Sequence, residues 1–72
     1  MDLKTEIFRV LPTEGEGMSA LDVAAAIFPD WTTRALKVKK NQIFGILVNA
    51  ERWDQVKRTG LKEDKSVLWV KT

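Results

Sequence analysis

Apolar residues recur every three or four positions along the first two thirds of the chain, and every second position near its end. Spacing of three and four gathers side chains on one face of an α-helix, whereas alternation gathers them on one face of a β-strand. The change of period after Trp53 therefore predicts helices followed by a hairpin. We expect helices at about residues 3–11, 19–28 and 39–50, and strands at about 53–59 and 66–71.

Polar residues at the expected helix starts support these boundaries. Asp2 can accept hydrogen bonds from the free amides of the first helical turn. Ser19 can do the same for the second helix, and Asp22 three residues later completes a variant of the capping box. Pro12 and Pro29 follow the first two apolar stripes and are typical of helix ends.

The stretch between the second and third helices allows two interpretations. Thr32 or Thr33 could begin a short helix that ends before Val38, or one long helix could run from Thr32 to Ala50. The break near Val38 is the preferred interpretation, because the last helix then has a regular apolar stripe of Val38, Ile43, Leu47 and Ala50. Asn41 would lie in the first turn of that helix.

The expected core combines residues from all of these elements. Alternation in the last strand leaves open whether Leu68 and Val70 or Val67 and Trp69 face inward, since a one-residue shift of register exchanges the two faces. Met18 could add a strand of one or two residues, and at least two of the three tryptophans are expected inside. The core is expected to contain Ile7, Leu11, Ala24, Ile27, Ile43, Leu47 and at least one of Val56 and Leu68.

Composition argues against catalysis. The 72 residues suffice for one domain and include neither cysteine nor histidine, so the commonest metal ligand and general base are both missing. Gly15-Glu16-Gly17 lacks the lysine of a phosphate-binding loop, and the serines have no histidine partner. No apolar run has the ~18 residues that a membrane span needs. We expect a cytoplasmic non-enzyme without metal, cofactor, small-molecule substrate or membrane contact.

Charge is distributed unevenly along the chain. Residues 1–30 carry six acids and two bases, a balance of −4, whereas residues 31–72 carry four acids and ten bases, a balance of +6. Residues 31–50 contain four bases and no acid. A one-sided distribution of this kind indicates a surface that faces a polyanion.

The order of these segments resembles the winged helix-turn-helix family. Leu3-x3-Ile7-Phe8-x2-Leu11 and Met18-Ser19-x2-Asp22-Val23-Ala24-x2-Ile27 are similar to the first two helices of that family. Val38-x4-Ile43-x3-Leu47-x2-Ala50 is similar to the recognition helix, and Val56 to Val70 to the wing. The resemblance covers essentially the whole chain and implies an α+β fold of three helices with a C-terminal two-stranded β-hairpin wing.

The resemblance also implies a function. In that family the recognition helix enters the DNA major groove and its N-terminal residues meet base edges, while the wing contacts the backbone. We therefore expect a protein that binds double-stranded DNA and acts as a regulator of transcription. The residues expected to contact nucleic acid are Arg34, Lys37, Lys39, Lys40, Asn41 and Gln42 around the recognition helix, and Lys62 and Lys65 at the tip of the wing.

Three departures from the family pattern keep an alternative open. The connection from Pro29 to Lys37 is longer than the usual turn. Phe44 and Gly45 occupy positions on the recognition helix where polar side chains are common, and Val48 would be exposed on the same face. Apolar residues there indicate protein contact or self-association, contact with thymine methyl groups, or a helix rotated so that Phe44 is buried. The alternative function is a non-catalytic module for protein–protein interaction.

Overall fold

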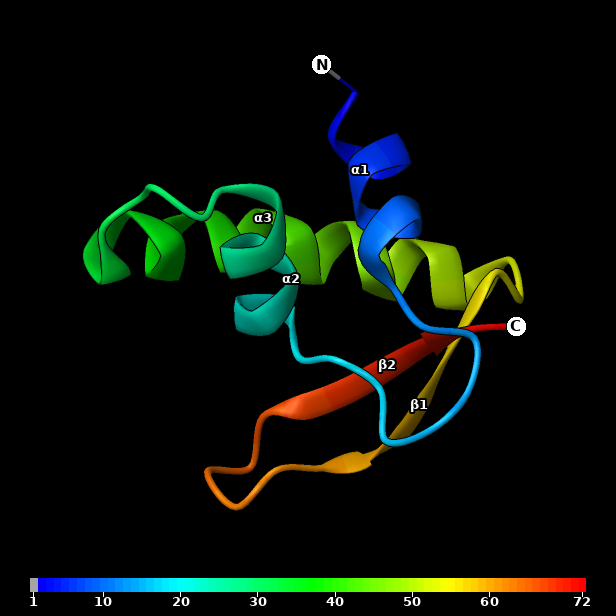
Figure 1. Cartoon of the computed structure of the whole chain (residues 1–72). Helices are drawn as coiled ribbons and strands as arrows, with labels where there is room; N and C mark the ends of the chain where they lie inside the picture. The colour runs from blue at the N-terminus through cyan, green and yellow to red at the C-terminus, as the bar shows by residue number, and fades with distance from the viewer. Residues whose placement is uncertain (1) are drawn as a thin grey trace.

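The computed structural model describes residues 2–72 as three helices and a two-stranded antiparallel sheet. The α+β class predicted from the sequence is confirmed, with three helices followed by a hairpin in the layout of a winged helix. The longest helix, α3, crosses the whole molecule, with α1 on one side and the hairpin on the other (Figure 1). The elements are α1 (Leu3–Val10), α2 (Ala20–Ile27), α3 (Thr33–Arg52), β1 (Val56–Leu61) and β2 (Val67–Lys71).

Each helix begins at a side chain that accepts a hydrogen bond from a backbone amide. Asp2 accepts from the Lys4 amide at 3.1 Å. Ser19 accepts from the Asp22 amide at 3.1 Å, and the Asp22 carboxylate accepts from the Ser19 amide at 3.3 Å, so the predicted capping box is present. Thr32 accepts from the amide three residues later and caps α3.

The break expected near Val38 is wrong, because α3 runs without interruption from Thr33 to Arg52. Val38 is 71% exposed and belongs to no apolar stripe. The face that packs inward instead follows continuous helical spacing through Leu36, Ile43, Leu47 and Ala50. The connection between α2 and α3 is therefore only residues 28–32, much shorter than the sequence pattern indicated.

The hairpin is closed against the rest of the chain by the segment that precedes α2. Met18 pairs with Trp69 of β2 through two backbone hydrogen bonds of 2.9 Å, which confirms the short strand expected at Met18. Gly17 makes this pairing possible, because its φ is +86° and a Cβ atom there would lie 2.5 Å from the Trp69 carbonyl oxygen. Along the hairpin, a bulge between Arg58 and Gly60 shifts the register of β1 against β2.

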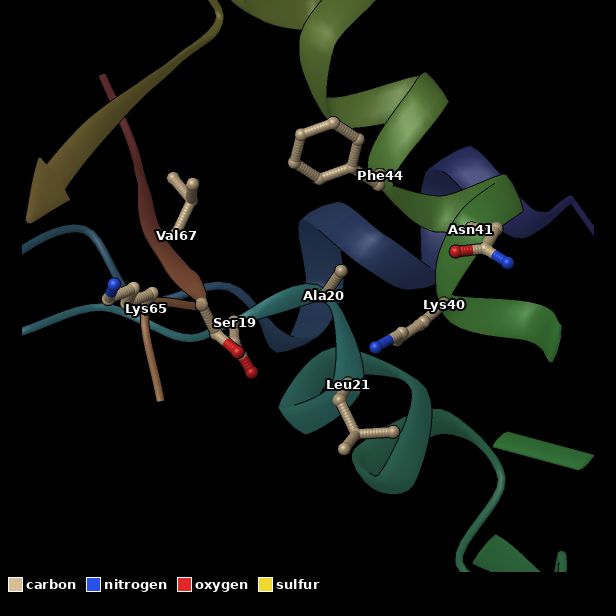
Figure 2. Close-up of a pocket in the computed structure, with 9 residues that line it drawn as sticks. Ser19, Ala20, Leu21, Lys40, Asn41, Phe44, Lys65 and Val67 are labelled. Carbon is tan, nitrogen blue, oxygen red and sulfur yellow. The ribbon is translucent and has the colours of Figure 1, made fainter. Parts of the chain in front are cut away.

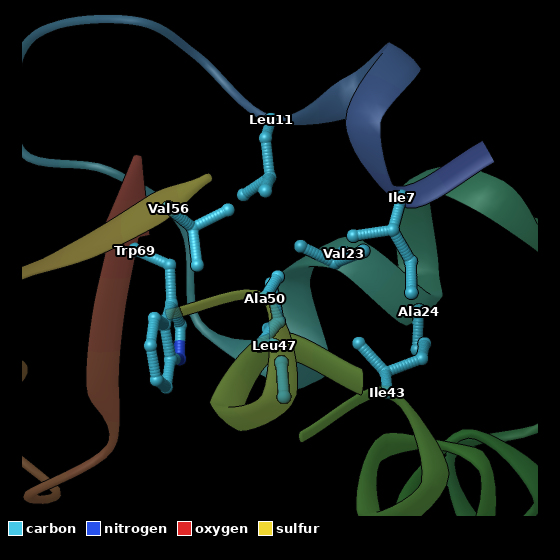
Figure 3. Packing of buried hydrophobic residues seen from close by; sticks show 10 residues of the cluster. Ile7, Leu11, Val23, Ala24, Ile43, Leu47, Ala50, Val56 and Trp69 are labelled. Carbon is cyan, nitrogen blue, oxygen red and sulfur yellow. The ribbon is translucent and has the colours of Figure 1, made fainter. Parts of the chain in front are cut away.

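The core forms where the helices meet the hairpin (Figure 3). Of the predicted core residues, Ile27 is only partly buried and packs at the margin. Both Trp69 and Val70 of β2 are buried, so burial does not alternate along this strand. The fully or almost fully buried apolar residues include Ile7, Leu11, Val23, Ala24, Ile43, Leu47, Ala50, Val56 and Trp69.

Only one of the three tryptophans is buried, so the expectation of at least two is wrong. Trp69 is completely enclosed, whereas Trp31 is 42% and Trp53 69% exposed. Trp53 caps the C-terminus of α3, just beyond the last buried turn. Trp31 lies in the connection to α3 and stacks on Phe28 with ring centroids 4.1 Å apart.

Across residues 2–72, the helices are too short or too polar to cross a membrane.

Candidate nucleic-acid interface

One face of α3 is turned away from the core along the whole helix. Its residues are spaced three or four positions apart, so they line up along the helix axis. All six are exposed, and the buried residues Ile43, Leu47 and Ala50 lie on the opposite side. We call this surface the outer face of α3; it consists of Arg34, Lys37, Asn41, Gly45, Val48 and Arg52.

The bases of this region are free of acidic partners. Among residues 2–72, the ion pairs within 4.0 Å are Arg9–Glu6, Arg58–Glu51 and Lys62–Asp22. Arg34, Lys37, Lys40 and Arg52 belong to none of them. The outer face thus presents unneutralised positive charge, which attracts a polyanion and raises its local concentration.

A groove of about 300 Å³ adjoins the outer face on the side of the hairpin. In Figure 2 the Lys40 side chain extends from α3 toward the start of α2, and the Phe44 ring turns toward Val67 of β2. Lys65, in the loop between the strands, also lines this groove, and in Figure 2 its side chain points away from Lys40. The structure therefore brings together three of the predicted contact residues, Lys40, Asn41 and Lys65, although 24 positions separate the last two in sequence.

The placement of Lys39 to Gln42 in the first helical turn is wrong, because α3 begins at Thr33 and they lie in its second and third turns. Lys39 Nζ donates a hydrogen bond to Gln42 Oε1 at 2.9 Å and lies 5.7–5.8 Å from the centroids of the Phe28 and Trp31 rings. Lys39 therefore makes its contacts within the protein, on the side of α3 that faces α2. The first turn instead carries Arg34, which is exposed.

Two cations of the hairpin form ion pairs with the helices. Lys62 Nζ lies 2.5 Å from the Asp22 carboxylate at the start of α2. Partial burial favours a higher pKa for Asp22, but hydrogen bonds from Lys62 and Ser19 outweigh it and leave this pKa below its ordinary value. The hydrogen bond to Asp22 raises the pKa of Lys62. Of the two lysines predicted at the wing tip, Lys62 is therefore neutralised within the fold, and Lys65 is the one without an ion pair.

The second attachment lies nearer the centre of the molecule. Arg58 Nε lies 3.0 Å from the Glu51 carboxylate of α3, and the guanidinium lies 5.0 Å from the centroid of the Trp69 ring. Glu51 is the only acid within α3. Because Arg58 neutralises it, this carboxylate does not offset the positive charge on the outer face.

Phe44 is neither fully buried nor fully exposed, the two possibilities that the sequence left open. Its ring packs edge-on against Trp69 with centroids 5.9 Å apart, yet the residue remains 40% exposed. Val48, one turn further along, is 36% exposed. Phe44 thus covers the core on one side and forms the apolar wall of the groove on the other.

Sequence reasoning missed Arg52, which extends the outer face to the C-terminal end of α3. The long-helix interpretation could have identified this residue, since Arg52 continues the helical spacing of Asn41 and Val48.

Among residues 2–72, no three carboxylate, histidine or cysteine side chains are grouped so that they could hold a metal ion.

In comparisons with known proteins, no family model matches the chain, and neither a curated protein nor a solved structure matches it significantly.

Proposed function

We propose that the protein binds double-stranded DNA through the outer face of α3, with Lys40 and Lys65 beside it, and that it acts as a small regulator of transcription. The observation that carries the proposal is the charge of this surface. Arg34, Lys37 and Arg52 project from one exposed helix face and none is neutralised by a described acid. Lysine and arginine at such spacing contact phosphates on a duplex.

The shape of the surface supports the same partner. An α-helix fits the major groove of B-form DNA, which is about 12 Å wide. The helix is 20 residues long, and its N-terminal part projects past α1 and the hairpin (Figure 1). Asn41, on the outer face, can hydrogen-bond adenine at N6 and N7 together. Gln42, the next residue, is also exposed and remains a predicted contact.

The hairpin would lie beside the duplex as a wing. Lys65 has a φ of 70°, in a turn where the Lys65 amide donates to the Lys62 carbonyl at 2.9 Å. The ion pair between Lys62 and Asp22 fixes this turn against α2, so Lys65 is held next to the groove. In this arrangement Lys62 positions the wing, and Lys65 supplies its phosphate contact.

A pair of charge-matched variants tests the proposal. Fluorescence anisotropy of a labelled 24-base-pair duplex at low salt should show binding by the wild type. Arg34→Ala with Lys37→Ala should weaken it at least tenfold, because two phosphate contacts are lost. Lys4→Ala with Arg9→Ala removes the same charge from α1 and should change affinity little. Equal losses in both variants, or no binding by the wild type, would refute the proposal.

Protein contact is the second candidate, and the exposure of Phe44 in the groove and of Val48 on the outer face favours it. In that case a partner protein or a second copy of the chain would cover the two side chains. Phe44→Ala and Val48→Ala would then abolish association detected by sedimentation, while the arginine and lysine variants of α3 would leave it intact. Absence of duplex binding together with self-association would establish this function in place of the first.

A further inference from the structure

Gly45 has no visible role inside the fold. It lies in the thirteenth position of the 20-residue α3, on the outer face, and it is exposed. A Cβ atom at this position would meet no other atom within 4 Å, and the backbone there is ordinary helix. Glycine within a helix is destabilising relative to alanine, so the residue weakens α3 without any compensating contact in the free protein.

The surroundings of Gly45 differ from the two ends of the same face. Its neighbours one turn away along this face are Asn41 and Val48, both uncharged. Positive charge lies further out, at Arg34 and Lys37 toward one end and at Arg52 toward the other. An uncharged centre between basic ends is complementary to a DNA groove, in which the bases form the floor and the phosphates form the rims.

We propose that Gly45 is the point of closest approach between α3 and the major groove, and that the space above it accepts the methyl group of a thymine. Val48 would contact that methyl group, while the Asn41 amide binds a neighbouring adenine. This inference rests on the proposed function and extends it to a preferred target, B-form DNA that contains A·T pairs. The deep, narrow major groove of double-stranded RNA would exclude the same helix face.

The substitution Gly45→Ala separates this role from a structural one. Alanine removes the helix penalty and should raise the Tm by about 4–8 °C in a domain of this size. The added methyl group fills the space that the thymine needs, and affinity for a 24-base-pair duplex of mixed A·T sequence should fall about tenfold. Gain of stability with loss of binding is the expected signature.

A modified duplex tests the thymine contact without changing the protein. Replacing every thymine by deoxyuridine removes only methyl groups and should weaken wild-type binding roughly fourfold for each contacted methyl. The Gly45→Ala variant should no longer distinguish the two duplexes. Ala26→Gly is the matched control, because it lowers helix propensity at an exposed position of α2 and should lower the Tm without changing either affinity.

The possible results distinguish the thymine contact at Gly45 from the proposed duplex binding on which it rests. Equal binding of thymine and deoxyuridine duplexes by the wild type, or unchanged affinity in Gly45→Ala, would overturn the inference while leaving duplex binding intact. A lower Tm in Gly45→Ala would also overturn it, since the glycine would then serve the fold. If neither these duplexes nor a G·C duplex of equal length binds at low salt, the proposed function itself fails.

Discussion

Leu47→Ala tests the packing of α3 on which the outer face depends. Leu47 is completely buried at the centre of the core, where helices and hairpin converge (Figure 3). Replacing a buried leucine by alanine costs about 2–5 kcal/mol, and more where the surroundings cannot collapse into the cavity. Because Leu47 belongs to a cluster drawn from every helix and both strands, little collapse is expected, and we predict a loss of about 3–4 kcal/mol.

That loss is large for a domain of this length. At about 0.05–0.15 kcal/mol per residue, a domain of 72 residues has a free energy of unfolding of about 4–11 kcal/mol. The variant should therefore show a Tm lower by about 12–30 °C, or be unfolded at room temperature. Thermal and urea denaturation followed by circular dichroism would measure the effect.

Val48→Ala is the matched control, because it truncates the next residue of the same helix. Val48 is 36% exposed on the outer face, so its truncation should cost less than about 1 kcal/mol. A melt of Leu47→Ala that matches the wild type, or an equal loss in the two variants, would show that α3 presents a different face to solvent. The nucleic-acid surface described above would then be misplaced.

Three further predictions concern the hairpin and the exposed tryptophan. Gly17→Ala should destabilise the protein by about 1–3 kcal/mol in urea denaturation, because the new Cβ would lie 2.5 Å from the Trp69 carbonyl oxygen; a neutral effect would contradict the pairing at Met18. The pKa of Asp22 is lower in the folded protein than in the unfolded chain, so the carboxylate is protonated at a higher pH in the unfolded chain. The free energy of unfolding should therefore decline as the pH drops toward and below 3.8. Asp22→Asn should be less stable at pH 7 and lose less on acidification, and an unchanged pH profile would refute this. Trp53→Phe should shift stability by no more than about 0.5 kcal/mol, whereas a cooperative loss of structure would mean that this side chain is buried.

Local signals in the sequence were sufficient for most of the fold. Asp2 and Ser19 cap α1 and α2 as predicted, because capping depends on residues within one turn. The change of hydrophobic period predicted the hairpin for the same reason. The break predicted between the second and third helices was wrong, since Val38 was assigned to the apolar stripe of the last helix although Leu36 supplies the inward contact.

The candidate site depended on contacts that no local pattern contains. Nothing in the sequence indicates that Lys62 pairs with Asp22 or that Lys40 and Lys65 line one groove, since both arrangements arise only when the hairpin folds back on α2 and α3. The face of α3 was likewise unresolved, because its rotation is set by packing against Trp69 and the other helices. The distribution of charged residues along the sequence indicated that positive charge lies in residues 31–72. Only the fold shows which of these bases form ion pairs and which do not.

The dependence of duplex affinity on salt tests duplex binding most directly. For a protein that contacts phosphates, the logarithm of affinity falls linearly with the logarithm of salt concentration, by about 0.9 for each contact. The wild type should show a steep slope, and Arg34→Ala with Lys37→Ala should flatten it by about 2, whereas Lys4→Ala with Arg9→Ala should leave it unchanged. A slope near zero for the wild type, or equal flattening by both double variants, would contradict the placement of the DNA-binding surface on α3.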